Sequence, residues 1–191
     1  MALYLLQEAS LGSASWLHPW IAALPSQVPL PWLPGGGRIL LAVSSPAALA
    51  ECEKLRGMYE AACQVHSRQH TPSQLAWALS IVYSRSFTLG EGHFMAPGID
   101  FCNHSPQPCA GVHLVHSPNS CQGLSAVEDV CPPPPPEPSR FVLVAGEDGI
   151  RAGAEVTISY GSWASDFFLT YFGFDPHGQE AEFLAVNTAG L

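Results

Sequence analysis

Basic residues are scarce in this sequence, which has seven Lys and Arg against sixteen Asp and Glu and a formal net charge of −9. Nucleic-acid binding depends on clustered basic side chains, so the composition argues against a nucleic-acid partner. No apolar run approaches the roughly 20 residues that a membrane-spanning helix needs, and no basic segment precedes the apolar N-terminal residues. We therefore expect a soluble intracellular protein that does not act in a membrane, with cytoplasm, nucleus and plastid all open.

Regular cysteine pairs are also missing. The chain has six cysteines but no C-x-x-C spacing, and its 191 residues are 47% hydrophobic. A core of that size does not depend on disulfides, so we expect most of the cysteines to be thiols.

Thiols and imidazoles are nevertheless concentrated in one region. Soft thiolates and imidazoles are the usual zinc ligands, so a zinc-binding interaction module is an alternative. The spacings are irregular, and we predict no metal site. The residues concerned are Cys102, His104, Cys109, His113, His116, Cys121 and Cys131.

Two catalytic signatures are absent as well. Gly35-Gly36-Gly37 lacks the following Lys-Ser or Lys-Thr of a phosphate-binding loop, and no Gly-x-Ser-x-Gly hydrolase element occurs. The Pro- and Gly-rich stretch 27–37 is interpreted as a loop, with the glycines as a flexible connection.

The first part of the chain has the pattern of helices. Ser45-Pro46 and Thr71-Pro72 each supply an N-cap residue followed by a proline suited to the first helical turn. Apolar residues at helical spacing follow both pairs. The predicted helices are a short buried one around Leu3, Tyr4, Leu5 and Leu6, one capped by Ser13 or Ser15 that runs through Trp16 and Trp20 to Pro25, one from Pro46 with Leu49, Cys52, Leu55, Met58 and Tyr59 on its apolar side, and one from Pro72 to near 83–86.

After Phe87 the pattern changes to short strands. Segments 94–102, 140–145 and 155–160 are apolar or rich in β-branched residues, and Gly-containing turns separate the last two. The stretch 117–139 contains five consecutive prolines and is predicted to be a surface insertion. A final helix is predicted over 165–172, ended by Gly173.

Two motifs place polar residues where strands are predicted to end. Asn103-His104 follows Ile99-Asp100-Phe101-Cys102, and Tyr160-Gly161 follows Glu155-Val156-Thr157-Ile158-Ser159. A sheet holds backbone and side chain in fixed positions at such ends, so both pairs are candidates for binding a ligand.

The order of these segments resembles the SET-domain protein methyltransferases, most closely the branch of the Rubisco large-subunit methyltransferase and its histidine- and lysine-methylating relatives. That branch has an aliphatic-Asp-x-x-Asn-His-Ser element, here 99–105, and a Gly-x-Glu-Val-x-Ile-x-Tyr-Gly element, here 153–161. Segment 3–25 looks like its inserted helical segment, and Ser84-Arg85-Ser86-Phe87 looks like its Ser-Arg-x-Phe piece. The resemblance implies an α+β fold, namely a SET-like β fold of short strands with an inserted N-terminal helical subdomain. The inserted helical region would span 1–86 and the C-terminal SET core 87–191, with the Pro-rich insertion near 117–139.

The resemblance also implies roles for individual residues. It places S-adenosyl-L-methionine (SAM) against Asn103 and His104, brings Arg85 to the carboxylate of the cofactor, and puts Tyr160 beside the transferred methyl group as both cofactor-binding and catalytic residue. Phe172 and Tyr171 would wall a channel for the substrate side chain.

Ordinary structural roles are open for the same residues. Asn103 can satisfy backbone groups at a turn, Arg85 can compensate the helix dipole, and Tyr160 can pack at a strand end with its hydroxyl on a backbone carbonyl. Core packing is open for Phe172 and Tyr171.

The implied activity is SAM-dependent N-methylation of a protein lysine, with histidine as the other acceptor. Relative to the family pattern we expect the chain to start after the Gly-x-Gly strand and to end before the C-terminal substrate-binding lobe, and Ser165 stands where the branch usually has Asn. A catalytically inactive SET-like protein-interaction module is therefore the main alternative. The sequence carries no signal for an oligomeric state.

Overall fold

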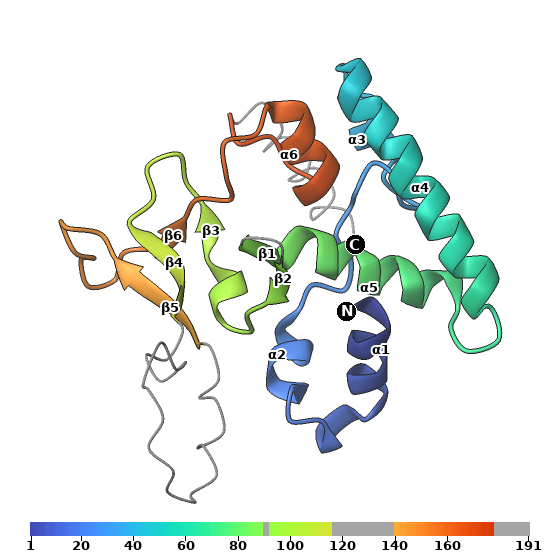
Figure 1. Cartoon of the computed structure of the whole chain (residues 1–191), viewed down its shortest axis with the longest axis horizontal. Helices are drawn as coiled ribbons and strands as arrows, with labels where there is room; N and C mark the ends of the chain where they lie inside the picture. The colour runs from blue at the N-terminus through green and yellow to red at the C-terminus, as the bar shows by residue number, and fades with distance from the viewer. Residues whose placement is uncertain (90–91, 116–139, 178–191) are drawn as a thin grey trace, which may run out of the picture. The chain divides into compact units, whose positions relative to one another are not determined.

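The computed structural model describes residues 1–89, 92–115 and 140–177. Helices occupy the chain up to Arg85, short strands lie between Ser86 and Ile158, and a last helix follows at Ser165–Phe172 (Figure 1). Two compact units make up the chain: Met1–Asp100 together with the chain from Gly161 onward, and Phe101–Tyr160. The last helix before the first strand ends at Arg85, one residue before the boundary predicted at 86. The division into an inserted region and a SET core stays a prediction.

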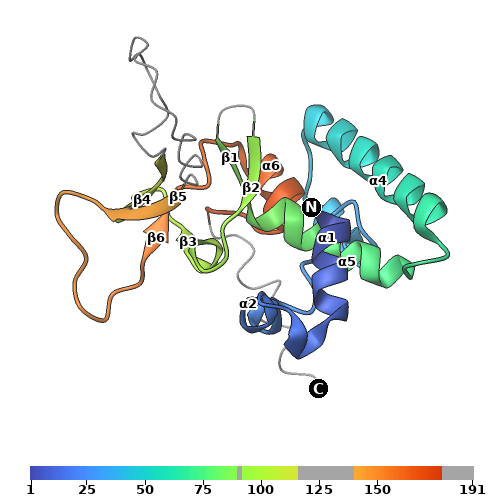
Figure 2. The same ribbon diagram turned by 60° about the horizontal axis from the view of Figure 1, so that its bottom comes forward.

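The first unit is built around one central helix. Helix α5 contacts α1, α4 and α6, and the helices bury a common apolar core that includes Leu5, Leu55, Leu75 and Ile81. Figure 2 shows α1 and α4 beside α5 from a second direction. The helices of this unit are α1 (Ala2–Ser10), η1 (Gly12–Ala14), α2 (His18–Ala23), α3 (Gly37–Leu40), α4 (Pro46–His66), α5 (Pro72–Arg85) and α6 (Ser165–Phe172).

The start signals of α4 and α5 are confirmed. Thr71 accepts a hydrogen bond from the Gln74 amide while the Gln74 side chain accepts from the Thr71 amide, which is a complete capping box. Ser45 is the N-cap of α4 but makes no side-chain cap; its own amide instead donates to Asp166 of α6. The apolar stripe of α4 includes Cys52, Leu55 and Tyr59 as predicted, whereas Met58 is exposed.

The N-terminal prediction needs two corrections. Leu5 and Leu6 of α1 are buried, but Leu3 and Tyr4 point to solvent, because only one face of this helix meets the core. The next helix starts at His18, with neither Ser13 nor Ser15 as its cap. Ser15 instead accepts from the Leu17 amide and donates to Glu8, which leaves Trp16 outside the helix and 76% exposed.

The loop over 27–37 is part of the core rather than a flexible connection. Leu30 and Trp32 are buried, and the Trp32 indole donates to the carbonyl of Thr170 in α6 at 2.9 Å. Trp32 also packs edge-on against Tyr83 of α5. Proline and glycine predicted the loop correctly, but the aromatic and leucine side chains within it decide where the loop lies.

The strand predicted over 94–102 is shorter than expected. Strand β1 (Ser86–Leu89) pairs antiparallel with β2 (Gly92–Met95), which ends before Pro97. Gly98 then adopts φ 95°, a conformation that side chains disfavour, and the turn leads into η2 (Ile99–Phe101). The Asp100 carboxylate accepts from the Gly98 amide and holds this turn.

The second unit contains two strand pairs. Strand β3 (Asn103–His104) pairs parallel with β6 (Thr157–Ile158), and β4 (Ala110–Val115) pairs antiparallel with β5 (Arg140–Ala145). The prediction for β5 is confirmed, β6 is shorter than predicted, and β4 was not predicted. The turns near Gly149 and Gly153 are confirmed, both with positive φ. The insertion predicted at 117–139 lies outside the described residues.

Helix α6 has the predicted bounds, and Gly173 ends it in the left-handed conformation with φ 79°. Among the described helices, none is long and apolar enough to cross a membrane. Cys52, Cys63, Cys102 and Cys109 are thiols, in agreement with the cysteine spacing.

The loop 27–37 supplies a test of the core. A Cβ added at Gly36 would lie 1.8 Å from the carbonyl oxygen of Leu30, whereas at Gly37 no described heavy atom lies within 4 Å of it. We expect Gly36→Ala to lower the free energy of unfolding by at least ~2 kcal/mol, because backbone has to move. Gly37→Ala is the matched control and should change it by less than ~0.5 kcal/mol. Urea unfolding measures both, and equal stabilities of the two variants would contradict the packing described.

Candidate functional site

The parallel pair β3–β6 brings the two sequence motifs together. Asn103 lies opposite Thr157 and His104 opposite Ile158, and the Ser105 amide donates to the Ile158 carbonyl at 3.0 Å. Ile158 is buried and anchors the pair. The Asn-His element and the segment that precedes Tyr160 therefore share one short sheet.

Tyr160 is held at both its backbone and its side chain. Its amide donates to Nδ1 of His104 at 3.2 Å, and its hydroxyl donates to the Cys102 carbonyl at 2.7 Å. Because Nδ1 accepts, the neutral His104 ring carries its proton on Nε2. The two rings also pack together, with centroids 5.4 Å apart. A hydroxyl on a backbone carbonyl is also what a purely structural tyrosine would show, so the catalytic role stays a prediction.

Asn103 is exposed, and its side-chain amide donates to Glu155, which precedes β6. Glu155 had no predicted role, although it belongs to the Gly-x-Glu-Val element. One of these residues comes from each motif, so this hydrogen bond joins the two motifs in addition to the pairing of β3 with β6.

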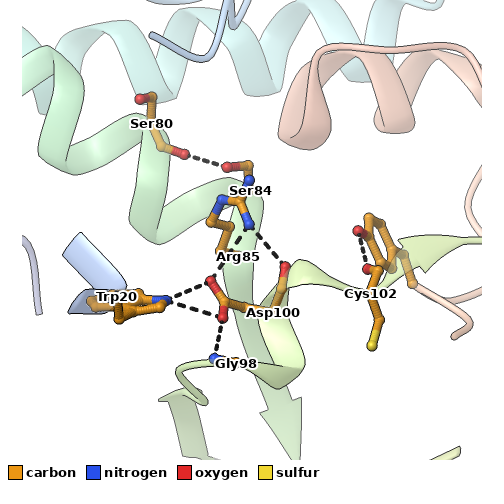
Figure 3. Close-up of polar contacts among 8 residues, drawn as sticks. Trp20, Ser80, Ser84, Arg85, Gly98, Asp100 and Cys102 are labelled. Carbon is orange, nitrogen blue, oxygen red and sulfur yellow. Dashed lines mark hydrogen bonds and ion pairs between the residues drawn. The ribbon is translucent and has the colours of Figure 1, made fainter. Parts of the chain in front are cut away.

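Arg85 belongs to the first unit and lies at the end of α5 (Figure 3). Its Nη1 donates to the Asp100 carbonyl at 2.9 Å and lies 3.5 Å from the Asp100 carboxylate. The Trp20 indole donates to the same carboxylate. The position of Arg85 as the last residue of α5 also suits compensation of the helix dipole. The sequence pointed to Arg85 alone; the aspartate of the aliphatic-Asp-x-x-Asn-His element and Trp20 had no predicted role.

Tyr171 and Phe172 pack within the first unit. Tyr171 donates to Glu51 of α4 at 3.1 Å and stacks on Phe167, while the Phe172 ring contacts Phe168 and Phe174. Burial, with the nearby Glu51 carboxylate, raises the pKa of Tyr171 to about 12. These contacts are those of core residues, and the substrate-channel role stays a prediction.

The sequence pointed to Cys109 only as one of the candidate zinc ligands, and the structure gives its thiol a different environment. Its sulfur accepts from the Thr157 amide at 3.3 Å and from the Thr157 hydroxyl at 3.6 Å. These hydrogen bonds stabilise the thiolate and lower the pKa of the Cys109 thiol.

The described residues contain no group of His, Cys, Asp and Glu that could hold a metal ion. His116, Cys121 and Cys131 lie outside the described residues. A cavity of about 270 Å³ lies between the loop 31–37 and α4, lined in part by Trp32, Arg56 and Tyr59, and contains none of the predicted site residues.

Comparison with known proteins identifies the fold. No family model and no curated protein sequence matches this chain. Solved structures do match this chain. The SET domain of LSMT bound to lysine and AdoHcy superimposes with a TM-score of 0.67 at 16% identity, covering 91% of this chain and 40% of that one. Rubisco LSMT bound to AdoMet gives a TM-score of 0.63 at 16% identity, and the match covers 91% of this chain and 38% of that one.

This chain has the SET fold. The mixed α+β class and the SET-like arrangement of short strands with N-terminal helices are confirmed. The chain spans about two fifths of the length of the solved proteins that it matches.

The contacts of Cys109 predict selective alkylation. At pH 7 to 8 we expect iodoacetamide to modify Cys109 faster than Cys52, because burial raises the pKa of the Cys52 thiol while two donors lower that of Cys109. Thr157→Val removes the hydroxyl donor and keeps the strand-forming shape, so it should slow modification of Cys109. Thr88→Val, in the β1–β2 hairpin, is the control. Peptide mass spectrometry follows each site, and an unchanged rate in Thr157→Val would refute the assignment.

The raised pKa of Tyr171 predicts a loss of stability at high pH. The neutral phenol is favoured in the folded state, so its contribution is complete below the unfolded pKa of about 10 and is lost as pH rises towards 12. Tyr171→Phe should make the urea midpoint of unfolding less dependent on pH between 10 and 12. Some pH dependence should remain in this variant, because burial also raises the pKa of Tyr59 to about 12. The exposed Tyr4→Phe is the control. Equal pH dependence in wild type and Tyr171→Phe would contradict this.

Proposed function

We propose that this domain binds S-adenosyl-L-methionine and methylates the side-chain nitrogen of a lysine in a protein substrate. The observation that carries the proposal is the joining of the two motifs by β3 and β6, with Tyr160 hydrogen-bonded to His104 and to the carbonyl of Cys102, which precedes the Asn-His pair. The SET fold supports it, since the solved SET domains of the same fold are described as bound to AdoMet, AdoHcy, lysine and monomethyllysine.

The residues present fit the proposed cofactor by their chemistry. Asn103 offers an exposed amide beside backbone groups of β3, which suits a purine, and Arg85 offers a guanidinium, which suits a carboxylate. We assign Asn103, His104, Arg85 and Tyr160 to cofactor binding on this basis. The cofactor supplies a methyl group on a sulfonium sulfur.

Tyr160 orients the acceptor nitrogen in this proposal. Its hydroxyl proton is committed to the Cys102 carbonyl, so its oxygen acts towards a substrate as a hydrogen-bond acceptor. Accepting one N–H of a neutral amine fixes the direction of the nitrogen lone pair without adding a charge. Alignment of a nucleophile in this way is the main requirement of an in-line displacement. Tyr160 is therefore the proposed catalytic residue.

The substrate side of the proposal rests on charge and apolar surface. A net charge of −9 favours approach of a basic, lysine-containing segment. Phe172 and Tyr171 are the proposed apolar wall of the channel, where desolvation would favour the neutral amine over the ammonium ion.

Calorimetry combined with a transfer assay tests the function. We expect the wild-type chain to bind SAM, and Tyr160→Phe to bind it within about threefold while methyl transfer to lysine peptides falls about 10²-fold. The variant keeps the aromatic ring but loses the orienting acceptor, together with the hydrogen bond to the Cys102 carbonyl. Tyr4→Phe, at an exposed tyrosine, is the matched control.

Two results would contradict the proposal. A folded wild-type chain that gives no heat with millimolar SAM would favour the inactive protein-interaction module. Unchanged transfer by Tyr160→Phe would remove the role of the hydroxyl.

A further inference from the structure

The Asp100 carboxylate accepts from three separate parts of the first unit, namely Trp20, Arg85 and Gly98. Its side chain is fully buried, with 0% exposure. The Trp20 indole N–H donates to both carboxylate oxygens, at 3.1 and 3.0 Å, and the Gly98 amide donates to Oδ1 at 2.8 Å. Figure 3 shows these two neutral donors on the carboxylate while Arg85 approaches from the other side.

The distance between Arg85 and this carboxylate is longer than in a close arginine–carboxylate ion pair. An arginine and a carboxylate frequently form a bidentate pair with N···O distances of about 2.7–2.9 Å. Here Nη1 lies 3.5 Å from Oδ2, and its shorter hydrogen bond, at 2.9 Å, goes to the backbone carbonyl of Asp100. Of these two Nη1 contacts, the shorter is therefore the one to the main chain.

The two neutral donors explain the long ion pair. Trp20 and Gly98 occupy lone-pair sites on the two carboxylate oxygens, and so leave fewer of these sites for a guanidinium. The turn holds the Gly98 amide in place, and the φ of 95° at this residue favours glycine. Trp20 is the donor that a side-chain substitution can remove, and it comes from α2, eighty positions away in the sequence.

We propose that Trp20 is a positioning residue that keeps Asp100 from closing a bidentate ion pair with Arg85, and so preserves the attraction of Arg85 for the carboxylate of the amino-acid part of the cofactor. The inference rests on the proposed function, in which Arg85 contacts that carboxylate. An internal carboxylate and a ligand carboxylate compete for the same guanidinium, and Trp20 biases this competition towards the ligand.

The test separates ligands with and without the carboxylate. By calorimetry on the full chain, Trp20→Phe should weaken binding of S-adenosylhomocysteine about 10-fold, the range for loss of a hydrogen bond to a charged group. Binding of 5′-methylthioadenosine, which has no carboxylate, should stay within about twofold. Adding Asp100→Asn to Trp20→Phe should restore S-adenosylhomocysteine binding to within about threefold of wild type, because an amide does not form the ion pair. Trp16→Phe, at the 76% exposed tryptophan, is the control.

A structural role alone gives different results. Equal loss of both ligands in Trp20→Phe, or a double variant that binds no better than Trp20→Phe, would overturn the proposal. Thermal unfolding of each variant shows whether it is folded.

A ligand-free measurement distinguishes this proposal from the proposed function. In NMR spectra, hydrogen exchange of the Arg85 guanidinium should slow in Trp20→Phe, because the ion pair closes, and return towards the wild-type rate in the double variant. This result would support the positioning role even if the wild-type chain bound neither ligand. Exchange unchanged by Trp20→Phe would overturn it even if the chain proved to be a methyltransferase.

Discussion

The candidate site depends on the parallel pairing of β3 with β6. Each strand has only two residues, yet they bring together motifs that lie about fifty positions apart in the chain. Parallel strands require a crossover connection, and here β4, β5 and their turns lie between the two strands in sequence. A shift of one residue would move buried Ile158 to the opposite face of the pair and displace Tyr160 from the Cys102 carbonyl.

Side-chain contacts stabilise a pairing that is too short to hold by its ladder alone. Asn103 bonds to Glu155, the Tyr160 hydroxyl bonds to Cys102, and the Cys109 amide and sulfur bond to Thr157. The residues that the resemblance assigns to cofactor and methyl transfer thus also fix the register of the sheet. Changes at Asn103 would for this reason affect folding as well as the proposed cofactor binding.

Local signals in the sequence predicted the elements that local interactions determine. The capping box at Thr71, the proline after Ser45, the run of β-branched and aromatic residues in β5 and the glycine after α6 lie in or directly beside the elements that they specify. Two of the features that the sequence did not predict depend on distant contacts. Trp32 reaches α6 across 138 positions and Trp20 reaches Asp100 across 80, and no local pattern encodes such partners. The strand end at Met95 was missed because an apolar run continues past Pro97 through the turn.

The most direct test of the site is to map the binding surface in solution by NMR. Titration of the isotopically labelled chain with S-adenosylhomocysteine is predicted to shift the amide signals of Asn103, His104 and Tyr160, and the guanidinium signal of Arg85. The residues that line the 270 Å³ cavity beside α4 are predicted to stay unchanged. Shifts confined to that cavity, or no shifts at millimolar ligand, would contradict a cofactor site built on the β3–β6 pair.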